Sequence, residues 1–318
     1  MTGGLAMTTR NSAPRVSIGL PVYNAERYLA DAFEALLAQD YRDLEIIVCD
    51  NRSTDGTWAI CRSFAERDGR VCLHRNEENR GAAYNYNRVV ELARGELFRW
   101  AAYDDLCAPT LVSRCVEALD ASAGRAVLTY PKTILIDGAG AEVGPYSDRL
   151  DLRDALAWWR VGRVAGRFNL CNALFGVLPI ARLRRTGLIR PYPSSDVTLL
   201  AELAALGEFH EVPEALFYRR IHEQSSRQGT DSERGSLAGV AAWFDPRRTG
   251  PVRAPRLQLT ARTATALLGN GSHLPAVTRV ACATSFATSF GIRRVRVLAG
   301  QARRNLRRSR RADGADRA

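Results

Sequence analysis

Lysine is almost absent from this chain of 318 residues, in which Lys132 is the only lysine among 45 basic side chains. A phosphate-binding loop of the Gly-Lys-Ser type needs a lysine after a glycine-rich turn, whereas Lys132 follows Pro131. The turn at residues 21–26, after the first apolar run, contains no glycine through which a pyrophosphate could approach the backbone. The sequence therefore excludes a phosphate-loop nucleotidase and argues against a dinucleotide-dependent oxidoreductase.

Paired cysteines and clustered histidines are also missing. The seven cysteines are an odd number with no Cys-x-x-Cys pair, and the four histidines show no metal-ligand spacing. Several cysteines stand among apolar residues, as small buried side chains do. These patterns exclude a disulfide framework and a zinc site, and they predict a reducing compartment.

No apolar run approaches the roughly 20 residues that a helix needs to cross a bilayer. Residues 1–14 lack the apolar core of a signal peptide, and we expect them to be a flexible N-terminus. We therefore expect the catalytic part of the chain to lie in the cytoplasm.

Short apolar runs alternate with helical patterns over residues 15–136. This alternation is typical of crossover helices on a mostly parallel sheet, so the predicted fold class is α/β. Strands are expected at 16–20, 45–49, 71–74 and 126–136, and helices at 25–38, 82–93 and 110–119. The first strand should stop at Pro21.

The segment from Glu96 to Asp105 is the centre of the functional argument. An apolar, aromatic run ends there in two adjacent carboxylates, Asp104 and Asp105. A strand that ends in two acids places them at the carboxyl edge of the sheet, where open α/β folds bind ligands and where a divalent cation would offset their repulsion. The alternative is a solvated acidic turn that caps the next helix.

Other polar residues follow the predicted strands and should gather at the same edge. They are Asn24, Asp50, Asn79 and Arg80. Polar loop residues are common, so only this convergence would be informative.

The second half has a different organisation. Residues 137–225 include a predicted amphipathic helix at 151–159, a helix at 197–206 and strands at 209–212 and 216–219. Residues 226–256 are predicted to be a linker or lid, because they are rich in Ser, Gly, Arg and Pro. Residues 257–318 form a predicted helical, arginine-rich extension.

Four motifs in order resemble glycosyltransferase family 2. They are Pro21-Val22-Tyr23-Asn24 with Glu26; Asp50-x-x-Ser53-x-Asp55-Gly56; Asn79-x-Gly81; and Asp104-Asp105 with Pro109. The resemblance spans roughly residues 15–225. It implies a GT-A fold, a nucleotide-diphosphate sugar donor, Mg²⁺ or Mn²⁺, and transfer of one hexose or deoxyhexose to an acceptor hydroxyl with inversion. It also implies a role in the synthesis of glycans, envelope polysaccharides or glycoconjugates, with a glycan or lipid-linked acceptor.

The resemblance also assigns roles to residues and divides the domain into a nucleotide-sugar half, 15–136, and an acceptor half, 137–225. Asp105 and His222 would hold the metal, and Asp196 would be the catalytic base. The donor would contact Pro21, Tyr23, Asn24, Glu26, Asp50, Asn79, Arg80, Gly81 and Asp104. Without the resemblance, Asp196 is more often an N-cap of the helix at 197–206, and His222 is more often a surface or core histidine.

The chain departs from the family pattern at three places. Ala102 occupies a position that is often acidic, Asn51-Arg52 replace the commoner Asp-Gly, and Ser195 precedes Asp196 where Glu is usual. The competing hypothesis is therefore a nucleotide-sugar or polyanion binding protein with weakened turnover. The pair Trp158-Trp159 fits stacking on an acceptor sugar or, more simply, packing on a helix face.

The net charge of +11 is concentrated at the C-terminus. From Arg293 onward the chain has ten arginines against two aspartates, a net of +8. This tail fits a solvated end, an anionic membrane surface or, least well, a nucleic acid. We favour peripheral contact with the inner face of the cell membrane, because Val277, Val280, Phe286 and Phe290 are spaced as one apolar helix face beside arginines and because family 2 acceptors are often lipid-linked.

Overall fold

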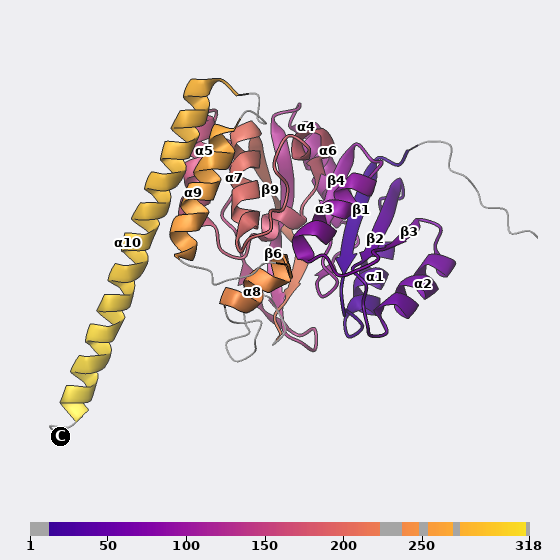
Figure 1. Ribbon diagram of the computed structural model, residues 1–318, viewed down its shortest axis with the longest axis horizontal. Coiled ribbons are helices and arrows are strands. Elements are labelled where there is room, and N and C mark those ends of the chain that lie inside the picture. The colour runs from indigo at the N-terminus through magenta and orange to yellow at the C-terminus, as the bar shows by residue number, and fades with distance from the viewer. Residues whose placement is uncertain (1–12, 223–236, 248–253, 270–273, 316–318) are drawn as a thin grey trace, which may run out of the picture.

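The computed structural model describes residues 13–222, 237–247, 254–269 and 274–315 (Figure 1). Most of the expected N-terminal segment 1–14 and much of the expected linker or lid at 226–256 lie outside the described residues.

A five-stranded sheet forms the first half, with strand order β3-β2-β1-β4-β8. Its bounds are Val16–Val22 (β1), Leu44–Asp50 (β2), Val71–Arg75 (β3), Leu97–Trp100 (β4) and Leu178–Pro179 (β8). The first four strands are parallel, and β8 is antiparallel to β4. All residues of β1 and β2 are buried, which explains why both strands read as continuous apolar runs. The predicted α/β fold is confirmed.

Helices cover both faces of this sheet. They are α1 (Leu29–Leu37), α2 (Thr57–Arg67), α3 (Ala82–Leu92) and α4 (Leu111–Ala121). Because side chains alternate along a strand, Ile46 and Val48 enter the core that contains α1, α2 and α4, while Ile47 and Cys49 enter the core that contains α3. At Gly19 of β1, an added Cβ would lie 2.6 Å from Val89 of α3, so this helix packs closely on the sheet.

Two predicted strand ends were wrong, and both bear on the site. β1 continues through Pro21 to Val22. β4 pairs only with residues 16–19 of β1, so no hydrogen bond to β4 is lost because Pro21 has no N–H. β4 ends at Trp100, and Asp104 and Asp105 therefore lie in the loop between β4 and the short strand β5 (Leu106–Cys107).

A second, mixed sheet has the order β5-β9-β6-β7. β6 spans Ala126–Ile136 as predicted, whereas β7 (Glu142–Tyr146) was not predicted. The two strands predicted at 209–212 and 216–219 are one strand, β9 (Glu208–Arg220), which pairs in parallel with β6 through register shifts and antiparallel with β5. The register Leu106↔Tyr218 brings the end of β9 beside the acid pair.

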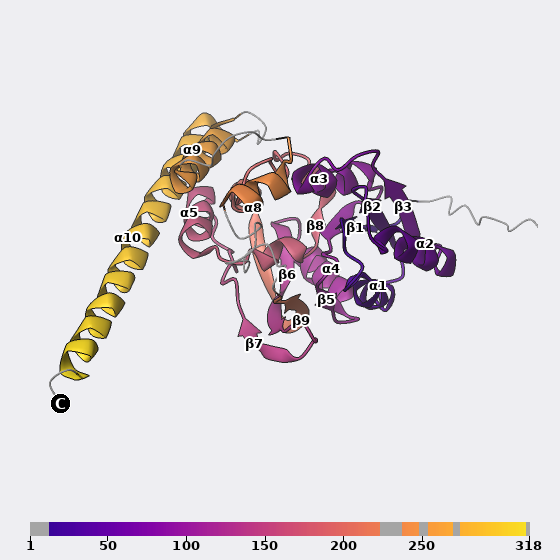
Figure 2. The ribbon, with the colours of Figure 1, turned by 60° about the horizontal axis from the view of Figure 1, so that its bottom comes forward.

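The remaining helices build the second half. They are α5 (Ala157–Arg167), the 3₁₀ turn η1 (Asn172–Phe175), α6 (Ile180–Leu183), α7 (Ser195–Leu206), α8 (Leu237–Phe244), α9 (Pro255–Leu268) and α10 (Ala276–Ala315). The helix predicted at 151–159 was wrong, because the backbone of Leu152 bonds to Phe209 instead and α5 begins at Ala157. Figure 1 shows α5, α7, α9 and α10 grouped together, and Figures 1 and 2 show the far end of α10 projecting from the body.

The apolar face proposed for the C-terminal segment is divided in the structure. Phe286 and Phe290 are buried against the domain, whereas Val277 and Val280 are exposed. These four residues therefore do not form one free apolar surface. Within the described ranges, no helix is both long and apolar enough to cross a membrane.

Asp148 gives this half a testable pH dependence. Its carboxylate is buried and accepts bonds from the Ala173 N–H (2.7 Å) and the Tyr146 hydroxyl (3.2 Å). Burial raises the pKa of Asp148 from 3.8 to about 6, so the folded protein holds a proton that the unfolded chain has lost. The free energy of unfolding should therefore fall as pH rises from about 4 to about 6, by roughly 3 kcal/mol at most.

Chemical denaturation of the wild type and Asp148→Asn across this pH range checks the prediction. The asparagine keeps an acceptor for the Ala173 N–H but does not titrate. As pH rises through this range, the wild type should lose stability relative to Asp148→Asn. A difference that is independent of pH would contradict the assignment.

Candidate active site

Two adjoining cavities lie on the side of the structure where the parallel strands end. The first, here called the acid-pair cavity, has a volume of about 350 Å³ and is lined by Asp104 and Asp105. The second, the Asp196 cavity, has a volume of about 260 Å³. Their common wall consists of Ala82, Tyr86, Phe175, Arg219, Val240 and Trp243. The acid pair and Asp196, separated by some 90 positions in the chain, therefore face neighbouring spaces.

The two acids of the pair have different surroundings. The Asp104 carboxylate contacts His222 Nε2 at 3.0 Å, and its backbone carbonyl accepts a bond from Arg220 Nε. Asp105 is 5% exposed, and its Oδ1 accepts the Arg220 N–H at 2.9 Å, with Arg219 Nε at 3.9 Å. Its Oδ2 is buried with no hydrogen-bond partner among the described residues.

Burial is the main cause that raises the pKa of Asp105 to about 7, and the neighbouring Asp104 adds to it. A buried carboxylate with an unsatisfied oxygen is stabilised by a proton or by a cation. Asp105 Oδ2 is therefore a position in this cavity where a proton or a cation would be stabilised.

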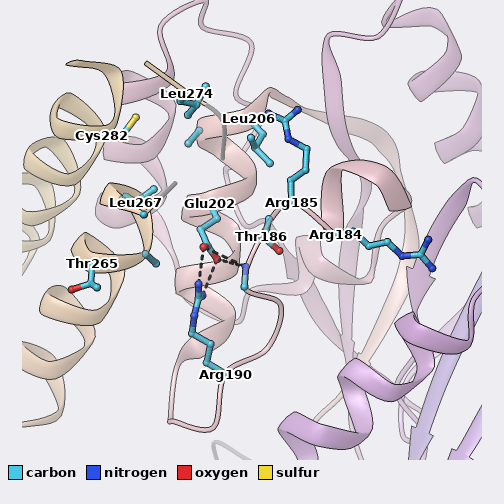
Figure 3. Close-up of a pocket in the computed structure, with 14 residues that line it drawn as sticks. Arg184, Arg185, Thr186, Arg190, Glu202, Leu206, Thr265, Leu267, Leu274 and Cys282 are labelled. Atoms are coloured by element: carbon cyan, nitrogen blue, oxygen red, sulfur yellow. Dashed lines mark hydrogen bonds and ion pairs between the residues drawn. The ribbon is translucent and has the colours of Figure 1, made fainter. Parts of the chain in front are cut away.

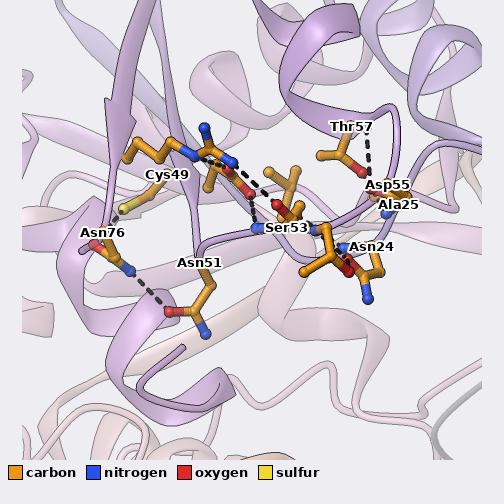
Figure 4. Close-up of polar contacts among 12 residues, drawn as sticks. Asn24, Ala25, Cys49, Asn51, Ser53, Asp55, Thr57 and Asn76 are labelled. Atoms are coloured by element: carbon orange, nitrogen blue, oxygen red, sulfur yellow. Dashed lines mark hydrogen bonds and ion pairs between the residues drawn. The ribbon is translucent and has the colours of Figure 1, made fainter. Parts of the chain in front are cut away.

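The first loop divides into a part that lines the cavity and a part that fastens the loop. Pro21 and Tyr23 line the acid-pair cavity. Asn24 and Glu26 do not: Asn24 Oδ1 accepts the Thr54 N–H at 3.0 Å, and Glu26 Oε2 accepts the Gly56 N–H at 2.7 Å. These bonds tie the loop after β1 to the loop before α2, and Figure 4 shows a further bond across this junction, from the Ala25 N–H to Thr57 Oγ1 at the start of α2.

Asp50 also lies behind the cavity wall. It is completely buried, accepts the Ser53 N–H at 3.0 Å and forms an ion pair with Arg75 at 2.9 Å. The next residue, Asn51, lines the cavity instead. Sequence reasoning treated Asn51 only as a departure from the family motif, although its position beside Asp50 was the signal that could have identified it.

Asn51 connects the polar loops through several bonds. Its Nδ2 donates to Asn79 Oδ1 at 2.7 Å, and its Oδ1 accepts from Asn76 Nδ2 at 2.9 Å and from the Arg80 N–H at 3.2 Å (Figure 4 shows the Asn76 bond). Asn79 lines the cavity, whereas the Arg80 guanidinium stacks over the Tyr84 ring at 3.7 Å. These bonds of the Asn51 side chain therefore position Asn79 at the cavity.

Comparison with known proteins decides the family. Residues 17–190, more than half of the chain, match the family described as Glycosyl transferase family 2. This chain belongs to that family. The match covers the two loops, the acid pair and most of the elements that carry them, and it confirms the resemblance seen in the motifs.

Individual relatives agree with this assignment. Glycosyltransferase GlyG from Streptococcus pneumoniae is 34% identical over 97 residues, which are 30% of this chain and 32% of GlyG. EpsE from Bacillus subtilis is 36% identical over 111 residues, 35% of this chain and 40% of EpsE. The chain thus spans less than half the length of these relatives. TarS from S. aureus, solved with UDP-GlcNAc, has a TM-score of 0.62 at 15% identity over 88% of this chain and 72% of TarS, and it shares the fold.

In this family 2 glycosyltransferase, Gly81 places α8 over the cavity. Gly81 has φ of +85°, and a Cβ there would lie 2.5 Å from the carbonyl oxygen of Phe244, at the end of α8. Gly239, Val240, Ala242 and Trp243 of α8 line the acid-pair cavity. The close approach explains why glycine stands at this position. The contribution of α8 to the site could not be read from the sequence.

We expect Gly81→Ala to displace α8 and to raise the KM for the donor by roughly tenfold, since the backbone clash and the strained φ together cost about 1–3 kcal/mol. Steady-state kinetics and thermal unfolding measure the effect. Gly124→Ala is a matched control, because Gly124 has φ of +79° with nothing near its added Cβ. Equal KM values for the two variants would show that α8 does not shape the donor site.

Asp196 lies in the first turn of α7 and lines the Asp196 cavity. Its Oδ1 accepts the Val197 N–H at 2.9 Å, so it also serves the helix end. The preceding turn is held by a bond of 3.1 Å from the Tyr192 hydroxyl to Thr198 Oγ1. A carboxylate in the first turn of a helix is stabilised by the helix dipole.

Arg219 was not predicted as a site residue, although it lines both cavities. It is one residue from the end of β9, and its guanidinium donates to Asn172 Oδ1 at 3.4 Å. Carboxylates near it, Asp105 first, raise its pKa against the opposing effect of burial, so it remains a cation. A fixed positive charge therefore lies in the common wall of the two cavities.

The donor set of the site fits a divalent cation that is held jointly with a ligand. Across the described ranges, no three His, Cys, Asp or Glu side chains converge on one point. Mg²⁺ and Mn²⁺ at phosphate sites need only one or two carboxylates, because phosphate oxygens and water complete their shell. Asp105 offers a buried oxygen for this purpose, while His222 Nε2 is already in contact with Asp104.

A third cavity, of about 510 Å³, shares no lining residue with the other two. It lies among α6, α7, α9 and α10 (Figure 3), and its most prominent feature is the pair of bonds from Arg190 to Glu202 at 2.7 and 2.8 Å. The charges of Arg190 and Glu202 neutralise each other, and this cavity contains neither the acid pair nor Asp196.

Proposed function

We propose that this chain transfers one sugar from a nucleotide-diphosphate donor to an acceptor hydroxyl, with inversion at the anomeric carbon and with Mg²⁺ or Mn²⁺. One observation carries the proposal: the acid pair and Asp196 face adjoining cavities with Arg219 in the common wall. The fold shared with TarS, which was solved with UDP-GlcNAc, supports a nucleotide-sugar donor in the acid-pair cavity.

In this proposal, the donor occupies the acid-pair cavity, with its nucleotide between the loops of Tyr23, Asn51 and Asn79. Asp105 and Asp104 would hold the cation against the diphosphate. When bound, the cation offsets the negative charge that grows on the leaving diphosphate. Arg219 contributes a second, permanent positive charge beside Asp105.

The acceptor enters through the Asp196 cavity in this scheme. Its hydroxyl oxygen attacks the anomeric carbon, the bond from that carbon to the phosphate oxygen breaks, and the electron pair leaves with the diphosphate. Asp196 takes the hydroxyl proton as the new bond forms. Attack from the side opposite the leaving group inverts the anomeric centre, which matches a base in one cavity and the acid pair in the other.

Release of nucleoside diphosphate tests the proposal. Purified protein with Mn²⁺ and a panel of nucleotide sugars should first be screened by thermal shift, because ligand binding raises apparent stability. The donor with the largest shift should then give acceptor-dependent release of nucleoside diphosphate, with the product analysed by NMR for anomeric configuration. A shift without release would favour the alternative of a binding protein with weakened turnover, and retention of configuration would exclude inversion.

A further inference from the structure

The helices α5 and α10 meet along a groove on the side of the molecule formed by the second half. A Cβ on Gly162 of α5 would lie 2.5 Å from Ser285 Oγ and 3.0 Å from Ser289 Oγ of α10, so the two helices touch there. Next to this contact, Phe168 stacks on the buried Phe290 with ring centroids 5.8 Å apart. The groove is therefore built on a rigid part of the structure.

Basic side chains line the groove. Its volume is about 460 Å³, and every charged residue among those that line it is an arginine: Arg163, Arg167, Arg293 and Arg296. Arg163 lies 3.5 Å from Asp154, while Arg167 donates to the Arg149 carbonyl at 3.0 Å and Arg293 stacks over Phe168 at 4.0 Å. Asp154 offsets the charge of Arg163, whereas these contacts of Arg167 and Arg293 involve no acid.

Exposed apolar side chains surround the arginines. Trp159 is 46% exposed and forms part of the groove, and Val295 on α10 is 67% exposed. Ile292 and Val297 of α10, which also line the groove, are exposed as well. Tryptophan with one apolar end and one hydrogen-bonding end is suited to the headgroup region of a membrane. Packing on a helix face therefore accounts for only the buried part of Trp158 and Trp159.

We propose that the α5–α10 groove docks this protein on an anionic phospholipid surface. The four arginines bind lipid phosphates, and the exposed tryptophans and aliphatic residues enter the boundary between headgroups and acyl chains. α10 extends beyond the groove into the segment that contains Arg303, Arg304 and Arg307 in the sequence, which continues the basic character. The membrane-facing surface is thus the groove and not the face that contains Phe286 and Phe290.

This pattern favours a membrane over a nucleic acid. Duplex-binding surfaces combine basic residues with polar groups, whereas here the exposed Trp159, Ile292 and Val297 line the groove together with the arginines. The proposal does not depend on sugar transfer, and its failure would leave the proposed enzyme activity untouched.

Point substitutions in the full-length chain are the appropriate test. Deletion of residues 257–318 would remove Leu259, Leu267 and Phe286, which are buried in the core, and would destabilise the domain. The test variant is Arg163→Glu/Arg296→Glu. The matched control is Arg42→Glu/Arg62→Glu, which changes two exposed arginines of the first half and gives the same net charge.

Flotation with vesicles of phosphatidylcholine alone or mixed with phosphatidylglycerol measures binding. The wild type should float only with the anionic vesicles. The test variant should bind them about 30-fold more weakly, since each basic side chain near an anionic surface contributes roughly fivefold. The control should stay close to the wild type. Trp159→Ala, which leaves the charge unchanged, should also weaken binding.

Three results would overturn the proposal: wild-type protein that does not float, equal loss in test and control variants, or arginine-dependent binding of duplex DNA without binding to vesicles. Thermal unfolding of each variant checks that it folds. If Arg163→Glu/Arg296→Glu is unstable, Arg296→Glu alone at its exposed position on α10 gives the decisive comparison.

Discussion

Replacing Asp105 with asparagine is expected to lower kcat/KM for sugar transfer by about 10³-fold, the effect of losing one preorganised electrostatic contact to the leaving group. The asparagine keeps an Oδ1 that can accept the Arg220 N–H, so the loop between β4 and β5 should keep its shape. What is lost is the negative charge on Oδ2, the buried oxygen that has no hydrogen-bond partner among the described residues. The neutral amide binds Mg²⁺ or Mn²⁺ weakly and leaves the diphosphate charge without its counterion.

Release of nucleoside diphosphate at saturating Mn²⁺ measures this effect, and a thermal melt reports on folding. Asp120→Asn is the matched control, because Asp120 is an exposed acid on α4 that pairs with Arg15 away from both cavities. The control should keep full activity. Activity of Asp105→Asn within tenfold of the wild type would show that the cation is held elsewhere.

Replacing Asp196 with asparagine is expected to lower kcat by about 10²–10⁴-fold and to leave the KM for the donor almost unchanged, because a general base acts in the chemical step. Asp196 is the second residue of α7, after the N-cap Ser194, and asparagine at this position can still accept the Val197 N–H. The substitution therefore separates the two roles that the sequence left open. If Asp196 only supports the end of α7, turnover will be unchanged.

Steady-state kinetics with varied donor and acceptor provide the measurement. Asp151→Asn is a suitable control, since Asp151 is an exposed acid of the same half that accepts the Glu211 N–H. A parallel loss of kcat in the control would point to a general electrostatic effect. A large increase in the donor KM for Asp196→Asn would place this residue with the donor and not with the acceptor.

Some parts of the fold were predictable because local sequence and burial agree. β1 and β2 are covered on both faces, and their apolar runs mark them without any knowledge of partners. β6 was predicted to the residue, since eleven residues of largely apolar character need a long buried strand. The partly exposed strand β7 has no such signal; it exists because β6 supplies its hydrogen bonds.

The residues of the site likewise divide into those with a local sequence motif and those placed only by distant contacts. Asp104, Asp105, Asn79 and Asp196 were identified because their motifs are local, and all four line the two cavities. Arg219 carries no local motif, and only the antiparallel pairing of β5 with β9 brings it next to Asp105. Asn51 lines the cavity in place of Asp50. The reason is again a distant contact, since Asp50 forms an ion pair with Arg75 of the neighbouring strand β3.

The amino-acid order by itself determined the family, the alternation of strands and helices, and the presence of acids in the loops, because these depend on residues that are close in sequence. Only the tertiary structure decided that Asp196 faces a space adjoining the acid pair, that α8 rests on Gly81 and that α10 buries its phenylalanines. Each of these depends on contacts between segments far apart in the chain, whose energies arise only when both segments are folded and in place.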